Sequence, residues 1–338
     1  MKRSFIIILC VTLLTIALEG CGLYRIGFMN AGNTIFNNPE KPGKVEKNPI
    51  RENVKLSVLW AGHSSALIQM YDKVILIDPV FNNVISGVMT RKYEAAIDLT
   101  NVSNIDMILV SHAHMDHLSI STLDDLEDKY SSAKLIVPMG AEEFLPGYDY
   151  DIIRLRTGNS AKKNYVGQTY EYNGLKVTAV YALHFGGRFG LDSYSWNMPG
   201  CTGFIVEYKD LTIFYAGDSV YEENGYKAIG NRFDIDLALV PVGPCRECEE
   251  DNSFSHIAAA GALKVFDDLK AKNMVPVHYG ALDYSRDPDY PVNILKELIT
   301  KKDGSSNSGQ SGVSYKDRIK IIDEGELFIF EELSADKK

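Results

Sequence analysis

Four apolar segments of this sequence each end on a side chain of a type that binds metal ions. Residues 107–110 lead to His112, residues 177–183 to His184, residues 213–216 to Asp218, and residues 275–277 to His278. Short apolar runs of this kind predict buried β-strands. Because strand ends in open α/β sheets gather at one edge, we expect the four side chains to meet in a single cleft.

Other apolar runs bounded by turn residues predict additional strands, and helical patterns lie between them. The additional strands are expected at 55–60, 66–70, 74–77, 134–137, 203–208 and 237–240, and the helices at 119–129, 292–301 and in the stretch after Ser255, where Ala259, Ala262, Leu263, Phe266 and Leu269 share one face. This order predicts an α/β or α+β protein with two sheets.

The segment after 107–110 carries three histidines and an aspartate within six residues, from His112 to His117. A loop can aim alternate side chains in two directions, so this segment can serve two metal ions. Imidazole and carboxylate ligands without thiolate suit two Zn²⁺ ions, with Fe or Mn as alternatives, and they leave an open, catalytic position. The expected ligands are His112, His114 and His184 for one ion and Asp116, His117 and His278 for the other, with Asp218 bridging the two.

The His-x-His-x-Asp-His segment resembles the metallo-β-lactamase superfamily. The remaining ligands of that family fall in order at His184, Asp218 and His278, and the resemblance covers roughly residues 56–282. It implies an α+β fold, the four-layer αβ/βα sandwich, with a dimetal site at the edge of the sheets. It also implies a metal-dependent hydrolase that acts through a metal-bound hydroxide.

A narrower resemblance lies in the segments 60–65 and 76–81. These look like the branch that holds N-acyl-phosphatidylethanolamine-hydrolysing phospholipase D and the ascorbate-phosphate lactonases, the phospholipase being nearer. The resemblance implies a phosphoric diester hydrolase acting on a phospholipid. The residues after His184 and at 90–93 differ from that branch, and a lactonase or other acyl hydrolase of the same fold is the alternative.

Two residues near the first strands are candidates to support the metal centre. Asp78 follows a predicted strand, where its carboxylate can orient a ligand imidazole or form a turn before Pro79. His63 can line the cleft and contact substrate, or it can hydrogen-bond within its Gly-Ser turn.

Two further residues are candidates to contact the substrate. His256 follows Ser255, a good N-cap, so we expect it at a helix N-terminus as a neutral imidazole. Together with Asp116 it is assigned a catalytic role, the alternative being a surface cap residue. Arg188 can grip a phosphate bidentately or be a solvated loop residue.

The charge of the chain restricts its partners. Lys and Arg number 35 against 45 Asp and Glu, a net charge of -10, so a nucleic acid is not expected to bind. Two dications would leave the cleft positive inside an acidic protein, which favours an anionic small molecule or a phospholipid. We therefore expect in-line hydrolysis of a phosphodiester. A non-enzymatic binding protein would require a damaged ligand set, and none of the seven ligands is missing.

The N-terminus predicts export. Lys2 and Arg3 precede a mostly apolar run at 5–18, which suits a signal peptide, and the run ends at Cys21 in a sequence that resembles the bacterial lipobox. We expect a signal peptide at 1–21, a lipidated Cys21, a tether at 22–54 and a hydrolase domain at 55–333. This predicts a membrane-anchored lipoprotein of the cell envelope or periplasm. A plain signal peptide is the alternative.

Three cysteines remain after such processing. Cys245 and Cys248 are close enough to form a disulfide in an exported protein, or both can be free thiols.

Five apolar residues after His184 form either an apolar lip beside the metals or part of the core. They are Phe185, Phe189, Leu191, Tyr194 and Met198. Residues 305–314, rich in Ser and Gly, predict a surface loop.

Overall fold

The computed structural model describes residues 38–333 apart from 86, 88, 189–199, 283–286 and 305–312. The predicted signal peptide, the lipobox and most of the apolar lip lie outside the described residues, as does most of the Ser- and Gly-rich loop. Within the described part, no helix combines the length and the apolar character that crossing a membrane requires.

The first sheet has seven strands and mixed directions. Its order is β17 (Leu327–Glu332), β1 (Val54–Gly62), β2 (Ser65–Met70), β3 (Lys73–Ile77), β6 (Met107–Leu109), β7 (Lys134–Pro138) and β8 (Asp151–Leu155). The strands from β17 to β3 pair antiparallel, and those from β3 to β8 pair parallel. The carboxyl ends of β3 and β6 therefore lie at the same edge of the sheet.

The second sheet has six strands and faces the first. Its order is β16 (Asn273–Val277), β13 (Leu237–Pro241), β12 (Leu211–Tyr215), β11 (Gly203–Tyr208), β10 (Leu175–Val180) and β9 (Val166–Tyr172). The strands β12, β13 and β16 are parallel neighbours, so their carboxyl ends also share one edge.

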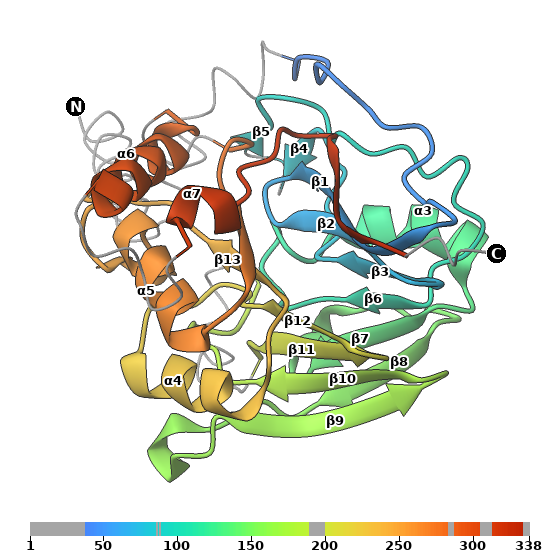
Figure 1. The fold of residues 1–338 in the computed structure, drawn as a ribbon. Helices are drawn as coiled ribbons and strands as arrows, with labels where there is room; N and C mark the ends of the chain where they lie inside the picture. The colour runs from blue at the N-terminus through green and yellow to red at the C-terminus, as the bar shows by residue number, and fades with distance from the viewer. Residues whose placement is uncertain are drawn as a thin grey trace, which may run out of the picture.

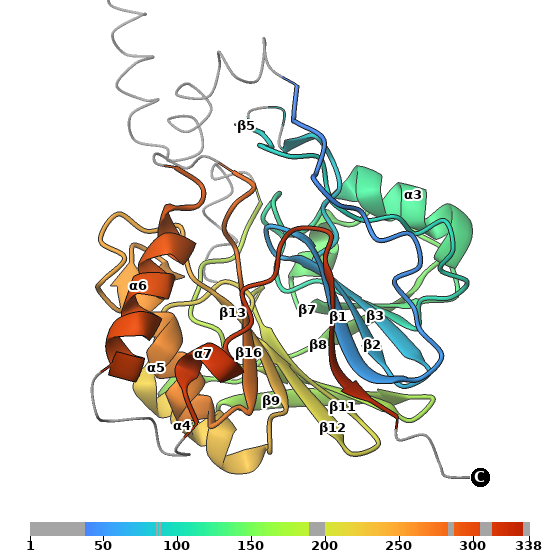
Figure 2. The same ribbon diagram turned by 45° about the horizontal axis from the view of Figure 1, so that its top comes forward.

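Helices cover the outer faces of both sheets, as Figures 1 and 2 show from two directions. The helix α3 (Ile120–Tyr130) lies on the first sheet, and α4 (Glu223–Arg232), α5 (Ala259–Leu269), α6 (Tyr290–Gly304) and the short α7 (Tyr315–Arg318) lie on the side of the second. The remaining described elements are short. Two are 3-10 turns, η1 (Ala141–Phe144) and η2 (Ser160–Lys162). The others form two hairpins, β4 (Val84–Ile85) with β5 (Met89–Thr90) and β14 (Asn252–Ser253) with β15 (His256–Ile257). The predicted α+β sandwich of four layers is confirmed.

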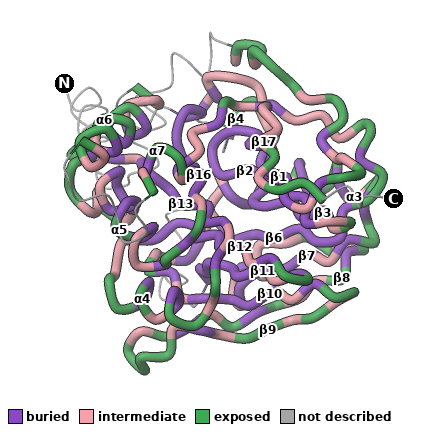
Figure 3. The backbone as a smooth tube through the Cα atoms, in the orientation of Figure 1, coloured by how far each residue is buried: buried purple, intermediate pink, exposed green. Residues whose placement is uncertain are grey.

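The alternation of side chains along β1 explains the two cores. Val58 and Trp60 pack between the sheets, whereas Leu59 and Ala61 pack on the side of α3. Successive side chains of a strand point to opposite faces, so a strand covered on both faces is apolar at nearly every position. Figure 3 shows this buried centre beneath an exposed shell of helices and loops.

Most predicted elements are confirmed to within two residues, and three strands of the sheets were missed. The missed strands are β8, β9 and β17. The predicted helix start at Ser255 is wrong: residues 256–257 form β15, and α5 begins at Ala259 after Ala258, which makes no side-chain cap bond. His256 is therefore a strand residue, and the argument from a helix dipole does not apply to it.

Residues 38–53, in the predicted tether, lie against the domain. The Glu40 amide donates to the Lys92 carbonyl at 2.9 Å, and the Arg51 amide donates to Gln69 Oε1 at 2.9 Å. Pro49 is buried. The first residues of this segment lie beside Lys92, and its last residues lead into the start of β1.

Candidate metal centre

All seven histidines of the chain lie in one cluster at the shared edge of the two sheets. They are His63, His112, His114, His117, His184, His256 and His278, and each belongs to a group whose ligand atoms lie within 4.8 Å of one another. The cluster also contains Asp116 and Asp218. The seven predicted metal ligands are therefore brought together, although they span residues 112–278.

The first predicted ligand set is compact. His112 Nε2 lies 2.9 Å from His114 Nδ1, and His184 Nε2 lies 3.2 Å from the same His114 atom. The other ring nitrogen of His184 faces the Ser255 carbonyl at 3.0 Å, which orients the ring. Three ring nitrogens thus converge on one position.

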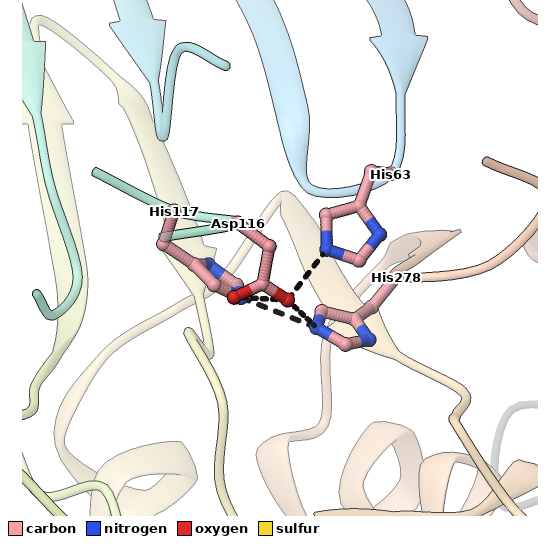
Figure 4. A group of neighbouring side chains, drawn as sticks. All are labelled: His63, Asp116, His117 and His278. Carbon is pink, nitrogen blue, oxygen red and sulfur yellow. Dashed lines mark hydrogen bonds and ion pairs between the residues drawn. The ribbon is translucent and has the colours of Figure 1, made fainter. Parts of the chain in front are cut away.

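The second set contains the three predicted residues and one more, as Figure 4 shows. His117 Nε2 and His278 Nε2 lie 3.2 Å apart, and Asp116 Oδ2 lies 3.7 Å from each. The additional residue is His63, whose Nε2 lies 3.1 Å from Asp116 Oδ2. The turn between β1 and β2 carries His63 into the cluster.

Asp218 lies between the two sets. Its Oδ2 is 3.3 Å from His117 Nε2 and 3.9 Å from both His112 Nε2 and His184 Nε2, while its Oδ1 is 3.2 Å from His278 Nε2. This carboxylate contacts members of both sets, which is the position that the predicted bridging role requires.

The protonation of the first set suits metal binding. Burial, reinforced by neighbouring imidazoles, lowers the pKa of His112 well below its usual range. Burial also lowers the pKa of His114 to about 4 and depresses that of His184. Neutral imidazoles keep the ring lone pair that a metal ion needs.

The carboxylates of the cluster are held ionised. Burial opposes the charge on Asp116 and Asp218, but His117 and the other nearby imidazoles outweigh it and hold both pKa values well below the usual range. Burial likewise opposes a proton on His117, yet Asp218 and Asp116 raise its pKa well above the usual value. The cluster therefore favours positive charge between its two carboxylates.

These residues fit metal ions. Lone-pair nitrogens and ionised oxygens converge without thiolate, and the buried Oδ1 of Asp218 accepts no hydrogen bond from the described residues. Structural zinc sites are rich in cysteine, whereas imidazole and carboxylate ligands are typical of catalytic sites. The cluster is therefore a metal-binding site.

Asp78 accepts hydrogen bonds from the metal-binding loop and contacts a predicted ligand imidazole. It is buried, and its carboxylate accepts hydrogen bonds from the Ser111 amide at 2.7 Å and the Ser111 hydroxyl at 2.6 Å, and it lies 2.7 Å from His117 Nδ1. A fourth donor is the Tyr215 hydroxyl, from the other sheet. Burial raises the pKa of Tyr215 well above its usual value, so its hydroxyl keeps the proton that it donates.

Strained backbone occurs where the chain enters the cluster. His63, Asp78 and His278 have φ values of 54°, 39° and 65°, in the left-handed region that residues other than glycine rarely adopt. Gly217, at φ 59°, leads into Asp218, and a Cβ there would lie 2.7 Å from the Thr202 carbonyl oxygen. Such strain is common at functional sites, where the surrounding packing holds it.

The two residues predicted to contact substrate lie beside the cluster in different ways. His256 Nε2 is 3.1 Å from Asp218 Oδ2, and its side chain is 17% exposed. Arg188 Nη1 donates to the carbonyls of Ala113 and Leu118, so it braces the loop that carries the ligands. Its contact with a phosphate stays a prediction.

The hairpin that carries His256 is held by a disulfide loop. Cys245 and Cys248 are bonded, the Arg246 amide donates to Ser253 Oγ at 3.2 Å, and the Cys248 carbonyl accepts from the Ala260 amide at 3.0 Å. The first of the two predicted alternatives for these cysteines is therefore the one observed. Cys201 is a free, buried thiol.

The two-sheet sandwich and its edge cluster of imidazoles and carboxylates define a metal-binding protein of the metallo-β-lactamase fold. The match to a family model is consistent with this: the Beta-lactamase superfamily domain matches residues 73–279, and the chain belongs to that family.

Known proteins resemble the chain at moderate identity. The mitochondrial N-acyl-phosphatidylethanolamine-hydrolyzing phospholipase D of Saccharomyces cerevisiae is 28% identical over 277 residues, 78% of this chain and 56% of that protein. The chain thus spans little more than half the length of that relative. A UPF0173 metal-dependent hydrolase of Saccharolobus solfataricus is 27% identical over 72% of this chain and 91% of its own length.

A solved structure shares the fold. The isothiocyanate hydrolase from Delia radicum gut bacteria superposes with a TM-score of 0.59 at 15% identity, covering 81% of this chain and 99% of that protein. At this identity the likeness concerns the fold alone, because one fold serves many reactions.

Proposed function

We propose that the protein hydrolyses a phosphodiester bond of a phospholipid such as N-acyl-phosphatidylethanolamine, using two Zn²⁺ ions, with Fe or Mn as alternatives. The similarity to the yeast phospholipase D over 78% of the chain supports the substrate class. The complete set of seven ligands supports two metal ions rather than one.

The residues of the site are suited to this reaction. Metal ions bound here would supply positive charge for an anionic phosphodiester and lower the pKa of water. The His256 imidazole reaches solvent and lies 3.1 Å from Asp218 Oδ2, so it can exchange a proton with the attacking water or the leaving oxygen. Asp116 Oδ2 lies 3.1 Å from His63 Nε2 and holds that imidazole beside the other ligands.

Metal removal provides the direct test. We expect a chelator to abolish turnover of a lipid phosphodiester, and Zn²⁺, Fe²⁺ or Mn²⁺ added singly to the dialysed protein to restore it. We also expect turnover of the phosphodiester to exceed that of any member of a lactone panel by about 100-fold in kcat/KM, close to 3 kcal/mol. Chelator-insensitive turnover would contradict the metal mechanism, and faster lactone hydrolysis would make the protein an acyl hydrolase.

Anchoring at a membrane is part of the same proposal. The run at 5–18 followed by Cys21 supports export and lipidation, and a diacylated cysteine would keep the enzyme at a lipid surface. In bacterial cells given labelled palmitate, we expect label in the wild-type chain and in Cys10→Ser, and none in Cys21→Ser. Cys10 is the matched control because it lies in the apolar run that precedes Cys21. Equal labelling of all three chains would contradict lipidation at Cys21.

A further inference from the structure

Phe254 is the most exposed large apolar side chain among the described residues. It is 94% exposed, whereas the others with notable exposure range from 36% to 46%. It lies in the turn between β14 and β15, with φ at 57°, an unusual conformation for a bulky residue. The hairpin therefore holds an aromatic ring in solvent with its backbone in a rarely adopted conformation.

Phe254 directly precedes two residues that contact the metal centre. The next residue, Ser255, faces His184 Nδ1 through its carbonyl at 3.0 Å, and the one after it, His256, lies 3.1 Å from Asp218 Oδ2. Leu183, which directly precedes His184, is 44% exposed. Phe254 and Leu183, both exposed and apolar, are therefore adjacent in sequence to Ser255 and His184, whose mutual contact orients a ligand ring.

The first described residues are linked by hydrogen bonds to the segment that follows the ligand His278. The Glu40 amide donates to the Lys92 carbonyl, and the Lys92 amide donates to the Ala281 carbonyl at 2.8 Å, three residues after His278. Cys21 precedes Asn38 by 17 residues (38 minus 21), which span at most roughly 60 Å when extended. An acyl anchor at Cys21 would therefore leave the segment after His278, and the metal centre beside it, within reach of the bilayer.

We infer that Phe254 and Leu183 dock the metal centre onto a phospholipid bilayer, with Phe254 entering its apolar layer. This rests on the proposed phospholipid substrate, because docking brings the cleft to a scissile bond at the lipid surface. A ring that leaves water for the acyl region is stabilised by the hydrophobic effect. The acidic residues Glu247, Glu249, Glu250 and Asp251 precede the hairpin, so the preferred surface is zwitterionic rather than anionic.

The first test compares substrates on the full-length enzyme. We expect Phe254→Ser to lower kcat/KM for lipid in zwitterionic vesicles by at least about tenfold and to leave a water-soluble phosphodiester within twofold. The matched control is Leu333→Ser. Leu333 is 39% exposed and directly follows β17. That end of β17 pairs with Val54 at the start of β1, whereas Gly62, at the other end of β1, leads to the turn that carries His63. An equal loss on both substrates would make Phe254 a structural residue and overturn the inference.

The second test needs no turnover. An environment-sensitive fluorophore is attached to the full-length protein at Phe254→Cys or at Leu333→Cys. We expect its emission to shift to the blue with phosphatidylcholine vesicles only at position 254. Identical behaviour at the two positions, or a shift confined to anionic vesicles, would overturn the inference. Because this measurement is independent of hydrolysis, a protein that docks but does not cleave phosphodiesters would refute the proposed function alone.

Discussion

Replacing Asp218 by alanine is expected to lower kcat/KM for phosphodiester hydrolysis by at least roughly 1,000-fold, about 4 kcal/mol of transition-state stabilisation. Asp218 lies near imidazoles of both ligand sets, with Oδ2 at 3.3 Å from His117 Nε2 and 3.9 Å from His112 Nε2, and Oδ1 at 3.2 Å from His278 Nε2. Its loss removes negative charge from between two expected cations, so repulsion between them is no longer offset.

Metal content distinguishes this effect from simple unfolding. We expect the Asp218→Ala protein to retain its fold by circular dichroism and to bind fewer metal ions per chain than the wild type. The matched control is Asp236→Asn, because this partly buried carboxylate accepts the Thr212 amide and pairs with Lys272 without contacting the cluster. Wild-type metal content and turnover within tenfold of normal in Asp218→Ala would exclude the cluster as the active site.

The metal ligands could be predicted from the sequence because their signal is local. An apolar strand followed within two residues by an imidazole or a carboxylate is visible in a short window of sequence, as at His112 and at Asp218. The parallel pairing of β3 with β6, and of β12 with β13 and β16, then places these strand ends at one edge.

The supporting residues could not be predicted with the same certainty because their partners are distant in sequence. Tyr215 reads as the last residue of an apolar strand, yet its hydroxyl reaches Asp78, 137 residues away and in the other sheet. His63 could be assigned only to the cleft or to a local turn, and its contact with Asp116 depends on how the turn between β1 and β2 lies over the loop.

The helix start at Ser255 was wrong for a related reason. A serine before an apolar helical pattern is a local capping signal, but the hairpin pairing of Ser253 with His256 competes with it. The strand β9 was missed because its seven residues, only one of them buried, carry no apolar run. In both cases tertiary pairing decided the structure.

Replacing Asp78 by alanine is expected to reduce the free energy of unfolding by about 3–5 kcal/mol. The substitution leaves buried donors of Ser111, His117 and Tyr215 without their acceptor. Removing one partner of a buried, fully hydrogen-bonded polar group typically lowers the free energy of unfolding by an amount of this size. Denaturant unfolding of the metal-free protein measures this loss at constant pH.

The metal affinity of Asp78→Ala shows whether Asp78 also positions a metal ligand, in addition to its effect on the free energy of unfolding. The Asp78 carboxylate orients His117 through Nδ1, so its loss is expected to weaken metal binding by roughly 10- to 100-fold in a chelator competition. Tyr215→Phe removes one donor and keeps the carboxylate, so it should cost only about 1 kcal/mol of stability and change metal affinity less. Tyr130→Phe is the control for a buried tyrosine elsewhere, since that hydroxyl donates to the carbonyls of Leu99 and Val102. If Asp78→Ala lost stability but kept the metal affinity of the wild type, Asp78 would stabilise the fold without orienting His117 toward a metal ion.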